Sequence, residues 1–144
     1  MAANGSARYG GWGLTLLRVV VGVVFIMHGK QKLFDFGFDG VSEMFSGLGV
    51  PLPEFAAVGV SLLEFGGGIA LVLGLLTRPV ALLLAADMAV ATLLFHLPKG
   101  FYNPGVEFTL TLFAACIALA LNGPGEAALD RVIGRRRGPG AGSS

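Results

Sequence analysis

The sequence predicts an all-α membrane protein, a bundle of four transmembrane helices with short helices at the membrane surface. Hydrophobic residues make up 54% of the 144 residues and charged residues only 13%, against about a quarter charged in an ordinary soluble domain. The apolar residues gather in four long runs that Pro and Gly separate. Leu and Ala dominate these runs, which lack the period-two alternation of a membrane-spanning strand, so we expect helices.

The four predicted transmembrane helices cover about residues 12–33, 53–76, 79–97 and 106–121. At about 1.5 Å per residue, each can cross a hydrocarbon core of about 30 Å, the fourth only barely. Arg18 interrupts the first run, which has no small-x-small cleavage site, so we expect a retained helix rather than a signal peptide. Pro51 and Pro53 precede the second helix, where proline fits the first turn. The short link Thr77-Arg78-Pro79 makes the second and third helices antiparallel neighbours.

Shorter elements and loose ends complete the predicted domain, which spans residues 12–133. Val41, Met44, Phe45 and Leu48 recur at helical spacing, which indicates a short amphipathic helix at the outer interface. Residues 126–133 can form a last interfacial helix. We expect residues 1–11 to be a flexible N-terminus and residues 134–144 a disordered basic tail that faces anionic lipid.

The distribution of Lys and Arg predicts the orientation in the membrane. With the N-terminus inside, the inner flanks carry Arg8, Arg78, Arg131, Arg135, Arg136 and Arg137. The outer flanks carry Lys30, Lys32 and Lys99. Both termini are therefore expected to be cytoplasmic.

Composition also excludes some functions. A net charge of +1 without a basic stripe argues against a nucleic-acid partner. Cys116 is the one cysteine, so the chain cannot form an internal disulfide or carry dithiol chemistry by itself. The sequence has no nucleophile–base pair, haem motif or flavin fingerprint, which leaves open whether the protein is an enzyme.

Ionisable residues inside the predicted helices fall into an inner and an outer layer, and such residues mark function by default. In the inner layer, Arg18 lies roughly 9 Å and Asp87 roughly 13 Å from the inner face. Because these depths are similar, we expect Arg18 and Asp87 to form a structural ion pair that locks the bundle.

The outer layer holds Glu64, His28, His96 and Glu107, at depths of roughly 21 to 27 Å. We interpret Glu64 either as a ligand-binding or proton-handling group or as a protonated packing residue, since burial disfavours the charged carboxylate. The two histidines are either part of that site or polar residues near helix ends. No His pair stands at ligand spacing, so no metal site is expected.

Small residues surround the outer layer on two helices. Gly67 and Gly68 lie at i+3 and i+4 from Glu64, so its face should be hollow, which suits tight helix packing or a cavity. On the first helix, Lys32 shares one face with Gly29 and Arg18. Lys32, Gly67 and Gly68 therefore join the candidates for ligand binding.

Five motifs in order resemble the DoxX family of small bacterial membrane proteins. They are LLRVVVGVVFIMHGKQKLF (16–34), GLGVPLP (47–53), LEFGGGIALVLGLLTRP (63–79), HLPKGFYNPGVEF (96–108) and NGPGEAALD (122–130). The family-pattern positions correspond here to Arg18, His28, Gly29, Lys32, Glu64, Gly67, Gly68, Arg78, His96, Glu107, Gly123, Gly125 and Asp130. Asp87 matches no family position.

The resemblance implies a four-helix bundle in the bacterial inner membrane and a link to redox enzymes. The family is named after a subunit associated with an archaeal terminal quinol oxidase, and some relatives are similar to the membrane subunit of thiosulfate:quinone oxidoreductase. We therefore expect a redox-associated subunit that binds a quinone or similar apolar ligand or supports an oxidoreductase complex. If the protein binds a quinone, Glu64, His28 and Glu107 would supply protons beside an apolar pocket.

Two other functions remain open from the sequence. The protein is alternatively a non-catalytic scaffold or assembly factor, in which the buried charges fix helix register and the loops hold an oxidoreductase partner. A small-solute permease would require a homo-oligomer, because four helices make a narrow bundle and no inverted repeat is visible.

Overall fold

The computed structural model describes residues 3–102 and 105–136, and confirms an all-α membrane protein. Within these residues the chain forms six α-helices, two π-helical turns and one 3₁₀ turn. In chain order they are α1 (Ala3–Lys30), η1 (Gln31–Phe36), α2 (Gly37–Gly47), α3 (Pro53–Leu73), α4 (Thr77–Ala91), η2 (Thr92–His96), η3 (Leu97–Lys99), α5 (Val106–Asn122) and α6 (Leu129–Arg136). Both π-helical turns, η1 and η2, continue directly from a long α-helix.

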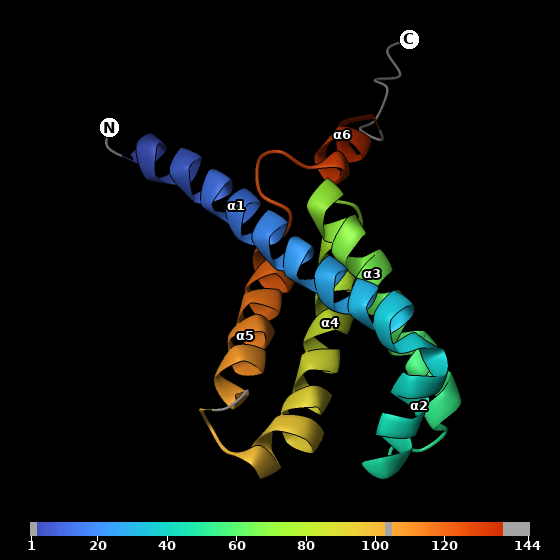
Figure 1. Ribbon diagram of the computed structural model, residues 1–144. Coiled ribbons are helices and arrows are strands. Elements are labelled where there is room, and N and C mark those ends of the chain that lie inside the picture. The colour runs from blue at the N-terminus through green and yellow to red at the C-terminus, as the bar shows by residue number, and fades with distance from the viewer. Residues whose placement is uncertain (1–2, 103–104, 137–144) are drawn as a thin grey trace.

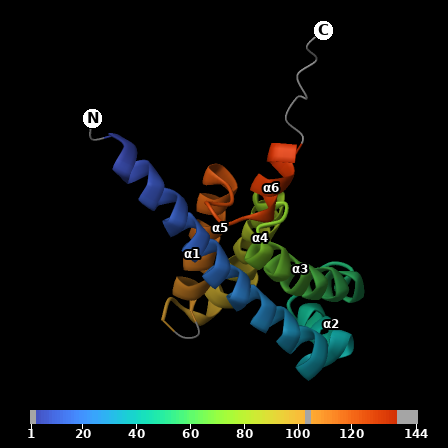
Figure 2. The same ribbon diagram turned by 90° about the horizontal axis from the view of Figure 1, so that it is seen from above.

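The helices pack as two groups. In one group α1 packs along α3, and the short α2 also lies against α3; in the other, α4 packs along α5. Figure 1 shows α1 crossing the bundle obliquely, and Figure 2 shows the same crossing from above. The start of α1, the turn between α3 and α4, and α6 lie at one end, which we call the terminal end (Figure 1). The opposite end, with α2 and the links after α2 and η3, is the loop end.

Three helical stretches are long and apolar enough to cross a membrane: Tyr9–Gly47, Pro53–Leu73 and Thr77–Lys99. The fourth, α5, has 17 residues and rises about 25 Å, close to the lower limit for a spanning helix. The large side chains on the outside of the bundle are mostly apolar, as Leu62, Leu82, Leu83 and Leu110 illustrate. The bundle therefore contacts the lipid bilayer on its sides.

Several helix boundaries differ from the predicted ones. The first helix begins at Ala3 rather than near residue 12, so residues 3–11 are helical. The second ends at Leu73, three residues early, where Gly74 takes the left-handed conformation typical of a helix C-terminus. The last helix, α6, runs to Arg136, which shortens the predicted tail, and residues 137–144 lie outside the described part of the chain.

Glycines bring α1 and α3 into backbone contact. A Cβ added to Gly22 would lie 2.8 Å from the carbonyl oxygen of Gly68, and one added to Gly68 would lie 2.7 Å from that of Gly22. Gly67 faces Val80 and Leu84 of α4, also at close range. Gly67 and Gly68 are thus helix-packing residues, and the hollow expected beside them is filled by α1 and α4.

Candidate functional site

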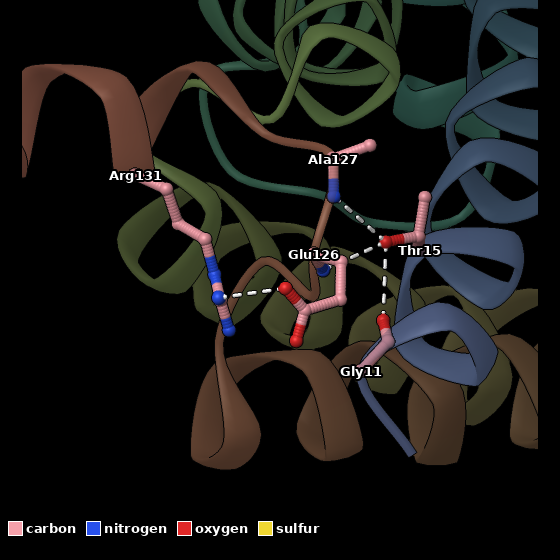
Figure 3. Close-up of polar contacts among 5 residues, drawn as sticks. All are labelled: Gly11, Thr15, Glu126, Ala127 and Arg131. Carbon is pink, nitrogen blue, oxygen red and sulfur yellow. Dashed lines mark hydrogen bonds and ion pairs between the residues drawn. The ribbon is translucent and has the colours of Figure 1, made fainter. Parts of the chain in front are cut away.

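Polar contacts at the terminal end join the start of α1 to the segment between α5 and α6. The Thr15 hydroxyl accepts hydrogen bonds from the backbone N–H groups of Glu126 (2.9 Å) and Ala127 (3.3 Å) and donates to the Gly11 carbonyl (3.1 Å), as Figure 3 shows. Arg131 forms an exposed ion pair with Glu126 (3.0 Å) in the same view. This end is therefore held mainly by bonds to backbone groups.

Asp130 extends this arrangement to the turn between α3 and α4. Its carboxylate oxygens accept hydrogen bonds from the N–H groups of Leu76 (2.7 Å) and Thr77 (2.9 Å), at the start of α4. Leu76 has a left-handed backbone (φ 47°), which a side chain disfavours. Asp130 thus holds a strained turn and caps a helix. We call the contacts of Gly11, Thr15, Arg18 and the 74–77 turn with residues 125–130 the terminal lock.

The expected ion pair between Arg18 and Asp87 is wrong. Arg18 is 1% exposed and donates from Nη2 to the carbonyl of Ala127 (2.5 Å), while its charge faces Asp130. Asp87 lies farther along α4 and faces Glu64. The predicted depth of Glu64 was too large because α3 ends at Leu73 rather than near residue 76. Glu64 therefore lies at nearly the same height as Asp87.

A cavity of about 450 Å³ opens in the loop-end half, between the two helix groups. Its volume falls in the range of small-molecule sites, about 300–1,000 Å³. Aromatic side chains from five elements line it: Phe25, Phe36, Phe45, Phe95 and Phe108. Its titratable side chains are His28, Lys32, Glu64, Asp87 and His96. An apolar wall with a few convergent polar groups is the usual form of a ligand site.

Lys32, Glu64 and Asp87 form one polar cluster in this cavity, which we call the acid–lysine cluster. The Lys32 ammonium donates to Glu64 Oε2 at 2.5 Å. The Glu64 side chain is 3% exposed and that of Lys32 is 19% exposed. The carboxyl of Asp87 faces that of Glu64, and Asp87 Oδ2 is buried without a hydrogen-bond partner.

The hairpin of α3 and α4 explains why the two acids meet. Glu64 lies nine residues before the last residue of α3, and Asp87 lies ten residues after the first residue of α4. Both are thus about 14–15 Å from the tight turn. Lys32 arrives from η1, a π-helical turn of the kind found frequently at functional sites.

The two histidines line the same cavity and come from different elements. The His28 ring of α1 lies 5.5 Å from the Phe108 ring of α5, and His96 in η2 lies 6.4 Å from the Phe95 ring. Phe95 also meets Phe45 of α2 edge-on at 5.8 Å. These contacts join the two helix groups at the loop end.

Glu107 does not belong to the cavity. Its side chain is exposed near the start of α5, and its carbonyl accepts a hydrogen bond from Thr111. A count of depth says nothing of the direction in which a helical side chain points. Within residues 3–102 and 105–136, no three His, Cys, Asp or Glu side chains gather in a way that would hold a metal ion.

Asp87 is the functional candidate that the sequence reasoning missed, since it was assigned to Arg18. The available signal was the short turn: residues equally far from it on two antiparallel helices lie at the same height in the bundle. By that count Glu64 and Asp87 share one height, which allows them to meet.

Comparison with known proteins gives a consistent picture. A family model described as DoxX matches residues 13–97. This range contains all five titratable residues of the cavity.

Full-length relatives are similar over most of their own length. A protein of Escherichia coli named "Inner membrane protein YqjF" is 32% identical over 126 residues, which cover 86% of this chain and 94% of the relative. A Bacillus subtilis protein named "Putative oxidoreductase CatD" is 34% identical over 128 residues, covering 88% and 92%. A second Escherichia coli protein, "Inner membrane protein YphA", is 32% identical over 125 residues, covering 82% and 88%. No solved structure matches the chain.

Proposed function

Because the chain belongs to the DoxX family, we propose that it binds a quinone or a similar flat apolar ligand in the loop-end cavity, as a membrane subunit associated with an oxidoreductase. One observation carries the proposal: an aromatic cavity of about 450 Å³ encloses an acid–lysine cluster within the membrane-spanning part of the bundle.

The aromatic lining suits a flat ring. Phe25, Phe45 and Phe95 line the cavity from α1, α2 and η2, and aromatic side chains pack against ring systems in offset or edge-on geometry. The remainder of the lining is largely aliphatic, so an isoprenoid tail would find apolar contacts there.

The titratable groups suit a ligand whose redox change moves protons. Reduction of a quinone takes up two protons, and groups that transfer them must lie within hydrogen-bond reach of the ring oxygens. Glu64, Asp87 and His28 line the cavity beside Lys32. A carboxyl pair that shares a proton is a suitable relay for this chemistry.

The names of the relatives support a membrane location and an association with an oxidoreductase. One relative carries the word oxidoreductase in its name and two are named inner membrane proteins. We extend these names to the present chain as part of the proposal: it lies in the bacterial inner membrane beside an oxidoreductase. The excess of arginine at the terminal end supports cytoplasmic termini.

Ligand-dependent stability tests the proposal. The protein is purified into lipid nanodiscs and titrated with a benzoquinone that carries a decyl tail. At a ligand concentration about 100 times Kd, binding should stabilise the fold by about 2.7 kcal/mol, which raises Tm. Absence of any shift, together with absence of extractable quinone from the purified protein, would overturn the proposal.

A matched pair of variants locates the binding. Ala91 lines the cavity, whereas Ala86 on the same helix is exposed outside it. Ala91→Phe should fill the cavity and abolish the shift, and Ala86→Phe should leave it unchanged. If wild type and Glu64→Gln retain the same oxidoreductase partner in pull-down while neither binds quinone, the scaffold function replaces this one.

A further inference from the structure

We propose that Asp87 accepts a hydrogen bond from the cavity's ligand, so that the site prefers a ring bearing a hydroxyl over the same ring bearing only carbonyls. In quinone chemistry this means preference for the reduced, quinol form. The inference rests on the proposed function and adds to it a residue, a bond direction and a selectivity.

The carboxyl of Asp87 has an oxygen whose hydrogen-bonding capacity is not used. Asp87 lines the cavity, and its Oδ2 is buried with no hydrogen-bond partner in the described part of the chain. A buried carboxyl oxygen without a donor is energetically costly, and more so when it is charged. A ligand that brings a donor removes this cost, whereas one that brings another acceptor does not.

The contacts of Glu64 and Asp87 indicate which of the two carboxyls carries a shared proton. Two carboxyls can hydrogen-bond to each other only if one of them is protonated. The Lys32 ammonium contacts Glu64 Oε2 at 2.5 Å, which favours the negative charge on Glu64 and the proton on Asp87. A proton held between the two carboxyls leaves Asp87 one oxygen that can only accept a hydrogen bond.

The other polar groups around Asp87 leave its Oδ2 without a hydrogen-bond donor. Glu64 faces it from α3 and Lys32 from η1. His28 of α1 and His96 of η2 line the same cavity, and Cys116 of α5 also lies near Asp87. From α2 the lining residues are Met44 and Phe45, neither of which titrates. None of these groups donates to Oδ2.

The roles within the acid–lysine cluster therefore differ. Asp87 would touch the ligand, Glu64 would hold Asp87 through the shared proton, and Lys32 would fix the charge on Glu64. Glu64 and Lys32 are positioning residues in this arrangement. An oxidised quinone has only carbonyl acceptors and would face the lone pairs of Oδ2.

The test compares three ligands that share one ring and one decyl tail: the quinol, the quinone and the dimethyl ether of the quinol. Binding to the full-length protein in nanodiscs is measured by calorimetry under argon. Wild type should bind the quinol about tenfold more tightly than either of the others, the equivalent of one hydrogen bond to a charged or strongly polar acceptor.

Variants assign this preference to Asp87. Asp87→Leu should reduce the quinol-to-quinone ratio to about one while quinone binding remains, because the apolar wall is intact. Glu107→Gln is the matched control: it also changes an acid at the loop end, but Glu107 is exposed and does not line the cavity, so the ratio should stay near ten. Lys32→Met should lower the quinol-to-quinone ratio, whereas Lys32→Arg, which keeps the positive charge, should leave the ratio near its wild-type value. A purely structural role of Lys32 would not predict this difference.

The outcomes separate the two proposals. If none of the three ligands binds to wild type, both proposals fail. If wild type binds quinone as tightly as quinol, or if the ether binds as tightly as the quinol, the role of Asp87 fails and the proposed function survives. The wild-type comparison decides this even if Asp87→Leu does not fold.

Discussion

The terminal lock and the acid–lysine cluster are both polar regions of an apolar bundle, yet their polar groups have different partners. In the terminal lock, Thr15 and Asp130 bind backbone N–H groups of segments distant in sequence. In the acid–lysine cluster, Lys32 and Glu64 bind side chain to side chain, beside a cavity. Bonds to backbone groups fix the path of the chain, whereas bonds between side chains next to a cavity can rearrange around a ligand.

This comparison implies that substitutions at the two ends have opposite effects on stability and on ligand binding. Substitutions in the terminal lock should lower stability and leave ligand binding unchanged. Substitutions in the acid–lysine cluster should cost less stability and weaken binding. Four substitutions test the contrast, in order of their expected effect on the free energy of unfolding.

Asp130→Ala should have the largest effect, a loss of about 2–3 kcal/mol, because two backbone N–H groups lose a charged acceptor. It also removes the cap of α4 and the charge that faces Arg18. Unfolding in mixed detergent micelles measures the change. Asp130→Asn keeps one acceptor oxygen and should lose about half as much; equal losses in the two variants would contradict the capping role.

Thr15→Val should lower stability by about 1–2 kcal/mol. The change keeps the shape of the side chain but removes the acceptor of the N–H groups of Glu126 and Ala127. Thr15→Ser, which retains the hydroxyl, is the control and should stay within about 0.5 kcal/mol of wild type. If Thr15→Val instead weakened quinone binding at unchanged stability, the two ends would not be independent.

Glu64→Gln should lower stability by about 1 kcal/mol, because Lys32 is partly exposed and can turn toward water. Its effect on ligand binding should be larger, a weakening of about tenfold, since Asp87 loses its charged partner. Paired titrations of stability and binding measure both quantities. A loss of several kcal/mol with unchanged binding would make the acid–lysine cluster a structural lock like the other end.

Glu126→Gln should have the smallest effect, below about 0.5 kcal/mol, because its ion pair with Arg131 is exposed. Raising the salt concentration should have a similarly small effect on wild type, since exposed pairs are screened. The backbone N–H of Glu126 still reaches Thr15 in this variant. A large loss measured by thermal unfolding would show that the ion pair, rather than the backbone bonds, holds this end.

The fold was largely predictable from the sequence because its causes are local. Long apolar runs set the number of helices, and Pro53 and Asn122 stand close to where helices begin and end. The π-helical turns were not predictable, because their hydrogen bonds depend on tertiary packing rather than on local composition. The early end of α3 at Gly74 was a missed signal, since Gly is the usual residue there.

The site was predictable only in part. Three residues of the predicted outer layer, His28, Glu64 and His96, do line one cavity, and so does Lys32, whereas Glu107 does not. The partner of Arg18 is a backbone carbonyl supplied by Ala127, and no pattern of side chains can reveal such a partner. Gly67 and Gly68 were correctly read as contact positions, but the sequence left open whether a helix or a ligand would occupy the space.

The π-helical turns have an evolutionary consequence. A π turn is equivalent to one extra residue within an α-helix, and one residue rotates everything beyond it by about 100°. Homologous proteins that lack the extra residue in 31–36 would carry a straight helix, with the counterpart of Phe45 in α2 turned away from the cavity. Single-residue gaps at 31–36 or 92–96 in an alignment would therefore divide the family into members with and without the aromatic lining that Phe45 and Phe95 give this cavity.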